Sequence, residues 1–179
     1  ERLAGERVDI DGFNVLTTVE AALADGVLLG GRDGCVRDMA SMHGSYRKVD
    51  ETAPALTLIG EVLNEFRPAE CCWYLDRPVS NSGRLKTLLG ELAREHSWPW
   101  EIRLTISPDA ELSSQLTVPG SRPSANCQPT TENRQLSSIV ASTDSVILDA
   151  CPAWTNLAAA ILTQRLPQTR IIDLAPTFS

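Results

Sequence analysis

The stretch Arg7-Val8-Asp9-Ile10-Asp11-Gly12-Phe13-Asn14-Val15-Leu16 is a short apolar strand that stops at Asp11-Gly12 and passes directly into helical spacing. Apolar stretches of strand length recur along the chain, each followed by a segment of helical periodicity. This alternation is typical of a parallel sheet wrapped by helices. We therefore expect an α/β fold, a three-layer Rossmann-like domain with a central parallel sheet.

The expected elements flank two irregular stretches. Strands are expected at residues 7–10, 70–75, 101–107, 138–142 and 169–174, and helices through residues 15–23, 51–66 and 83–96, the last capped by Ser80 or Asn81. A helical region after Asp144 is interrupted near Pro152 and resumes through residues 154–162. Residues 25–50 form a glycine-rich connector, and residues 107–131 a surface loop with a short helical turn near residues 110–116.

Length and composition favour one globular domain over residues 1–179, because 42% of the residues are hydrophobic and 22% are charged. No apolar run approaches the roughly 18 to 20 residues that cross a bilayer, which excludes a membrane protein. The net charge is −7 and the pI is near 4.8. A chain this acidic does not coat nucleic acid by bulk charge, so any contact with nucleic acid needs a local basic patch.

The five cysteines form no C-x-x-C pair, and their odd number argues against a disulfide framework. We therefore expect a reducing, cytoplasmic location. Cys71 and Cys72 lie in an apolar run, where a strand would point them to opposite faces as small core residues. The chain begins with Glu1 and not with Met, which is compatible with a fragment of a longer protein.

Three predicted strands end on an aspartate: Asp11, Asp76 and Asp144. In open parallel sheets, ligands bind at the carboxyl ends of the strands, so these side chains are expected to converge at one edge. Clustered carboxylates repel one another, and a hard divalent cation with oxygen ligands relieves that repulsion. The pattern therefore predicts a site for Mg²⁺ or Mn²⁺, with Asp149, five residues after Asp144, as a further ligand.

The competing interpretation is that each aspartate caps the helix after its strand, because Asp is a favoured N-cap residue. Three acids at three strand ends make that interpretation weaker than it is for one acid alone. Asp149 is equally compatible with a solvated helix residue, and Asp109, after the third predicted strand, is a candidate for the rim of the site.

The stretch Ile10-Asp11-Gly12-Phe13-Asn14-Val15-Leu16 resembles the opening D-G-x-N-V-L motif of the PIN-like superfamily, particularly its NYN branch of ribonucleases. The stretch Ala141-Ser142-Thr143-Asp144-Ser145 is similar to the Ser/Thr-x-Asp element of that superfamily. The segments Gly31-Arg32-Asp33-Gly34, Arg37-Asp38 and His43-Gly44-Ser45-Tyr46-Arg47-Lys48-Val49 resemble an uncharacterised prokaryotic family of PIN-like domains. The resemblance spans nearly the whole chain.

The resemblance implies a parallel sheet of order 3-2-1-4-5 and a metal-dependent nuclease site at the strand ends. Asp11, Asp76 and Asp144 occupy the acidic positions, Asn14 supports the first loop, and Ser142 or Thr143 lies near the metal. Many PIN nucleases carry a further acid on a helix between the first and last of these positions. Residues 25–50 offer no clear equivalent of that acid.

Residues 25–50 also hold the basic residues Arg32, Arg37, Arg47 and Lys48, together with His43 and several aspartates. This loop is either a solvated face of mixed charge or a phosphate-binding loop, in which arginine forks match phosphate oxygens. Arg77 and Arg84 would add to the same basic rim. The candidate substrate-binding residues are Asn14, Arg32, Arg37, His43, Arg47, Arg77 and Ser142.

The sequence thus predicts a metal-dependent nuclease that hydrolyses phosphodiester bonds with RNA as its substrate. The alternative is a catalytically inactive PIN-like domain that binds RNA or protein. A small-molecule-binding Rossmann domain is disfavoured, because no G-x-G-x-x-G follows the first strand. Homo-oligomer formation is left open.

Overall fold

A computed structural model describes residues 3–39, 46, 49–114 and 138–174. Its main sheet has five parallel strands in the order β5-β4-β1-β6-β7. Their bounds are Arg7–Asp11 for β1, Glu70–Asp76 for β4, Trp100–Thr105 for β5, Ser138–Ala141 for β6 and Trp154–Thr155 for β7. The expected α/β class with a central parallel sheet is confirmed.

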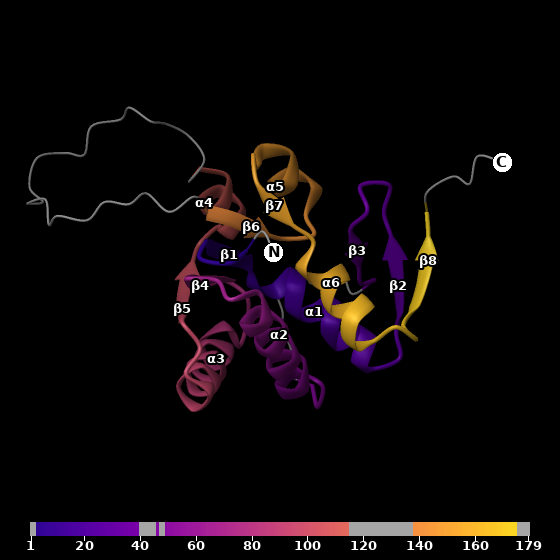
Figure 1. The fold of residues 1–179 in the computed structure, drawn as a ribbon. Helices are drawn as coiled ribbons and strands as arrows, with labels where there is room; N and C mark the ends of the chain where they lie inside the picture. Colours follow the sequence, from indigo (N-terminus) through magenta and orange to yellow (C-terminus); the bar gives the residue numbers. More distant parts are fainter. Residues whose placement is uncertain (1–2, 40–45, 47–48, 115–137, 175–179) are drawn as a thin grey trace, which may run out of the picture.

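Helices cover both faces of this sheet (Figure 1). One face carries α1 (Gly12–Leu23), α2 (Thr52–Phe66) and α3 (Ser82–His96), and α6 (Leu157–Arg165) packs on α1 and α2. The other face carries α4 (Pro108–Ser114) and α5 (Ser145–Ala150). No helix in the described part of the chain is both long enough and apolar enough to cross a membrane.

The alternation of side chains along β4 separates the two cores. Cys71 and Trp73 lie in the large core beneath α1, α2 and α3, whereas Cys72 and Tyr74 lie in the smaller core beneath α4 and α5. Both cysteines are fully buried and free of disulfide bonds. The prediction that they are core residues on opposite faces of a strand is confirmed.

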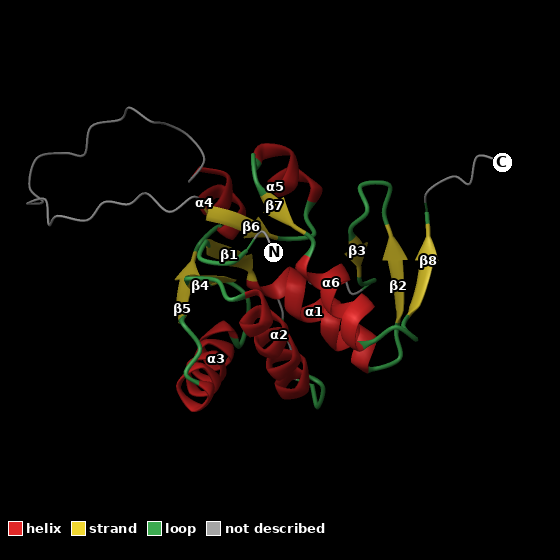
Figure 2. Ribbon diagram, viewed as in Figure 1, coloured by secondary structure: helices red, strands yellow, loops and turns green. Residues whose placement is uncertain are grey.

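A second sheet lies beyond α1 and α6 (Figure 2). It has the order β3-β2-β8, with β2 at Val27–Gly30, β3 at Val36–Arg37 and β8 at Arg170–Asp173. Two of these strands fall in residues 25–50, where the sequence predicted only an irregular connector. They are short, and the pairing of β2 with β8 joins segments about 140 residues apart, which local periodicity does not reveal.

The prediction for the last strand was wrong in its position. Residues 170–173 do form a strand, but they pair with β2 in the second sheet, and β7 occupies the edge of the main sheet beside β6. The sheet order therefore differs from the predicted 3-2-1-4-5 at its fifth place, which β7 takes. The strands β5, β4, β1 and β6 correspond to the third, second, first and fourth predicted strands and follow the predicted order. Trp154, which was expected to be helical, belongs to β7, because α6 begins only after Asn156, whose side chain accepts a hydrogen bond from the Ala159 backbone N–H at 3.1 Å.

Candidate functional site

Five aspartates line one cavity of about 300 Å³ at the carboxyl end of the main sheet, and we call this cavity the acid pocket. Its lining consists of Asp11, Phe13, Asn14, Thr17, Arg37, Asp38, Asp76, Val79, Asp109, Thr143 and Asp144. The three acids predicted at strand ends are among them. The structure also adds Asp38, and it includes Asp109, the acid expected at the rim.

The parallel topology brings the three strand-end acids together. Strand β1 lies between β4 and β6, so the chain leaves all three strands at the same edge of the sheet. Gly12 permits a close approach there, because a Cβ atom at this position would lie 2.9 Å from the Tyr74 carbonyl oxygen and 2.5 Å from a Leu75 methyl group. The Asp-Gly sequence thus places the first acid against the neighbouring strand.

Asp11 is the most buried acid of the pocket, with 4% of its surface exposed. Its Oδ2 accepts hydrogen bonds from the Asn14 side-chain amide and, at 2.7 Å, from the Ser142 hydroxyl. Burial raises the pKa of Asp11 to about 6, the two hydrogen bonds oppose that rise, and the charges of Asp109 and Asp144 add to it. Asp11 occupies the N-cap position of α1 but makes no side-chain cap, so the capping interpretation does not apply to it.

The capping interpretation does apply to Asp144. Its Oδ1 accepts a hydrogen bond from the Val146 backbone N–H at 2.7 Å at the start of α5. The same side chain lines the acid pocket, so it contributes both to the helix end and to the charge of the pocket. Asp144 is therefore both a helix cap and a carboxylate of the acid pocket.

Asp76 and Asp109 face the pocket from β4 and α4. The pKa of Asp76 is raised first by burial and then by the charge of Asp109. The pKa of Asp109 is likewise raised by burial and by the charge of Asp144. The charge of one pocket carboxylate thus disfavours ionisation of the next across the cavity.

Asp38 is the pocket acid that sequence reasoning missed. It follows β3, and its Oδ2 accepts hydrogen bonds from the hydroxyls of Thr17 at 2.8 Å and Thr18 at 3.4 Å on α1. The two adjacent threonines among the buried residues of α1 were the available signal. The threonines do not by themselves identify Asp38 as their partner, because the contact depends on how the β2–β3 hairpin folds back onto α1.

Arg37 is the predicted basic residue that lines the acid pocket. Its guanidinium forms an ion pair with Asp33, and its Nε donates a hydrogen bond to the Thr143 carbonyl oxygen at 2.7 Å. Arg37 therefore ties the β2–β3 hairpin to the end of β6, next to Asp144. Because the guanidinium is already paired with Asp33, its main role in the structure is to hold the hairpin in place.

None of the remaining predicted residues that the structure describes lines the pocket. Arg32, Arg77 and Asp149 are exposed and lie outside its lining, so the structure does not bring Asp149 to the other acids. Ser142 is buried behind the pocket and acts through its hydrogen bond to Asp11. The other predicted residues, His43, Arg47 and Lys48, lie outside the described residues.

The donor set of the pocket suits a hard cation, because its ligands are carboxylate, amide and hydroxyl oxygens. Among the described residues, no three His, Cys, Asp or Glu side chains are close enough together to hold one ion by themselves. Mg²⁺ usually keeps several water ligands and is bound through one or two carboxylates together with substrate phosphates. The residues present therefore fit a hydrated ion held by a subset of the aspartates.

A relative of this chain is the "Uncharacterized protein MJ0935" of Methanocaldococcus jannaschii, which is 30% identical over 114 residues. The match covers 64% of this chain and 54% of the relative, so it spans about half of the relative's length. No solved structure matches the chain. The family described as "Domain of unknown function (DUF5616)" matches residues 1–160, which include every residue of the acid pocket, and the chain belongs to that family.

Proposed function

We propose that this domain is a metal-dependent nuclease of the PIN-like, NYN type that hydrolyses phosphodiester bonds in RNA. The observation that carries the proposal is the convergence of five aspartates in one pocket at the carboxyl end of a parallel sheet. Such a pocket is unfavourable without a counter-charge, as the raised pKa values of three of its members indicate. A bound divalent cation supplies that counter-charge.

A hydrated Mg²⁺ or Mn²⁺ would take its protein ligands from a subset of the pocket carboxylates, Asp11, Asp76 and Asp144 first, with Asp38 and Asp109 in the same pocket and water completing the coordination. The cation would supply an activated water and stabilise the negative charge that develops on the phosphate. The chain's own contribution is to position the ligands. Asn14 and Ser142 hold the Asp11 carboxylate, while Arg37 holds the backbone next to Asp144.

The PIN-like relationship rests on the resemblance of the Asp11 and Asp144 motifs, and it is supported by the placement of β1 between β4 and β6. Many PIN nucleases carry a further acid between the positions of Asp11 and Asp144. Asp38 is a candidate for that acid in this chain. It comes from the hairpin after α1 and not from a helix.

The second candidate function is an inactive PIN-like domain that binds RNA or protein. The absence of a ready three-ligand group among the described residues favours it. The two functions differ in what happens when a pocket acid is replaced. In a nuclease, losing one carboxylate lowers the cleavage rate by orders of magnitude while substrate binding is largely retained.

Cleavage of labelled single-stranded RNA in Mn²⁺ tests the proposal. We expect cutting by the wild type, no cutting in the presence of a chelator, and no cutting but retained binding by Asp76→Asn and Asp144→Asn. Asp25→Asn is the matched control, because Asp25 is exposed at the far end of α1 with φ 55°, a conformation that Asn tolerates. RNA binding of equal affinity in all variants, with no metal-dependent cleavage of any substrate, would establish the inactive binding domain.

A further inference from the structure

Beside the acid pocket lies a second cavity, of about 440 Å³, which we call the α3 cavity. It is lined by Tyr46, Thr52, Asn81, Arg84, Leu85, Thr87, Leu88 and Glu91, most of them on α3. The acid pocket does not use any of these side chains. The proposed chemistry therefore leaves the function of this cavity open.

The two cavities are neighbours. Phe13 lines the acid pocket and Tyr46 lines the α3 cavity, and the centroids of their rings lie 5.2 Å apart. The turn between β4 and α3 also borders both, with Val79 in the acid pocket and Asn81 in the α3 cavity. The Asn81 side-chain amide donates a hydrogen bond to the Tyr46 carbonyl oxygen at 2.8 Å, which joins the two walls of the α3 cavity.

The α3 cavity has a charged group at each end and apolar side chains between them. Arg84 lies in the first turn of α3, beside the turn that borders the acid pocket, and Glu91 lies seven residues later, about 10 Å along the helix axis. Leu85 and Leu88 lie between them in sequence. Among the described residues, neither Arg84 nor Glu91 has an ion-pair or side-chain hydrogen-bond partner.

This arrangement matches a nucleotide unit. A guanidinium binds phosphate oxygens, apolar side chains contact the flat faces of a base, and a carboxylate accepts hydrogen bonds from an exocyclic amino group. The cationic end is the one nearer the acid pocket, where the proposed function places the reacting phosphate. Resting on that proposed function, we propose that the α3 cavity holds one nucleotide of the substrate strand, with its phosphate on Arg84 and its base reaching Glu91.

The proposal predicts selectivity among bases. Adenine, cytosine and guanine carry an exocyclic amino group, and uracil does not, so Glu91 should favour the first three. Affinity for short oligo(A) and oligo(C) RNA should exceed affinity for oligo(U) by about tenfold, the size expected for one hydrogen bond to a charged group. Fluorescence anisotropy with Asp144→Asn protein in Mg²⁺ measures binding without cleavage.

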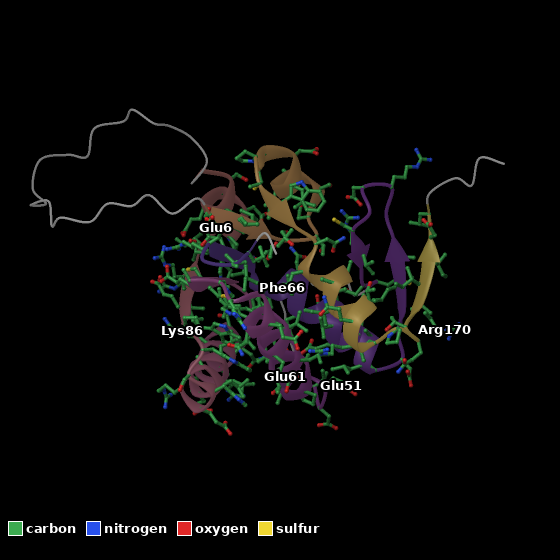
Figure 3. All side chains as sticks on the ribbon, in the orientation of Figure 1. Glu6, Glu51, Glu61, Phe66, Lys86 and Arg170 are labelled. Atoms are coloured by element: carbon green, nitrogen blue, oxygen red, sulfur yellow. The ribbon has the colours of Figure 1, made fainter. Side chains whose placement is uncertain are left out.

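Two variants of exposed residues test the two ends of the cavity. Arg84→Glu should weaken binding of all three oligonucleotides by at least about tenfold and lower the slope of log affinity against log salt by about 0.7. Glu91→Gln should selectively reduce the preference for oligo(A) and oligo(C) over oligo(U). Lys86→Glu and Glu61→Gln are matched controls, since both residues are exposed on the same helical layer and outside the cavity lining (Figure 3).

A third variant, Leu88→Trp, fills the cavity without changing its charge and should also block binding. Unchanged affinity in Arg84→Glu and Leu88→Trp, together with equal binding of the three oligonucleotides, would overturn the proposal even if the wild type cleaves RNA. Base-dependent binding that these variants abolish, in a protein that cuts nothing, would support the nucleotide site and reject the nuclease. The two failures are therefore distinguishable.

Discussion

Asp11→Asn should make the protein more stable at neutral pH when no divalent cation is present. The substitution removes the charge of a fully buried carboxyl group, while an amide oxygen in the place of Oδ2 can still accept the hydrogen bonds from Asn14 and Ser142. The second oxygen position, which becomes the amide NH₂ group, makes no hydrogen bond to any residue that the structure describes. The change is therefore close to a pure removal of charge.

The size and sign follow from the pKa of Asp11, which is raised from 3.8 to about 6. Between these two pH values the folded state holds a proton that the unfolded chain has released, so the wild type loses stability as the pH rises. At about 1.4 kcal/mol per pH unit, this interval amounts to about 3 kcal/mol, lost in full above pH 6. Asp11→Asn does not titrate at this position and should keep that stability.

Urea unfolding of both proteins at several pH values between 4 and 8, in the presence of a chelator, measures the difference. The two unfolding free energies should be similar near pH 4 and diverge up to a plateau above pH 6, with the variant more stable by as much as about 3 kcal/mol. Added Mg²⁺ or Mn²⁺ should raise the stability of the wild type and should raise that of the variant less. A variant that is less stable than the wild type at pH 7 to 8 would refute the electrostatic account of the pocket.

Three further outcomes are expected. Gly60→Ala should lower the thermal midpoint and the free energy of unfolding by about 1 to 3 kcal/mol, because a Cβ atom there would lie 2.1 Å from the ring of Trp98. In the control Gly90→Ala, the new Cβ atom meets nothing within 4 Å, so this variant should be neutral or stabilising. Tyr46→Phe should cost about 1 to 3 kcal/mol in urea unfolding, because it removes a hydroxyl that donates to the buried Glu20 carboxylate. In calorimetric titration, the affinity of the acid pocket for Mn²⁺ should fall as the pH drops below about 6, because a proton on its most buried carboxyl group competes with the cation; an affinity independent of pH would place the cation elsewhere.

Local patterns in the sequence were sufficient for the main elements. The α/β class, β1, α2, β4, α3 and β6 were predicted within one or two residues, because each combines a clear period of apolar residues with a turn or breaker at its end. The same patterns placed an aspartate at three strand ends, and parallel pairing brought these acids to one edge. That part of the site could be read from the chain because it follows from strand direction alone.

The tertiary structure alone decided the remainder. β8 forms part of a second sheet, Asp38 completes the acid pocket, Asp149 stays outside it, and Arg84 lines a cavity beside it. Each of these placements depends on contacts between segments far apart in the chain or on the direction in which one side chain leaves its helix. Short strands and charged surface residues leave little periodic signal, because the energy that selects their positions comes from non-local packing and pairing.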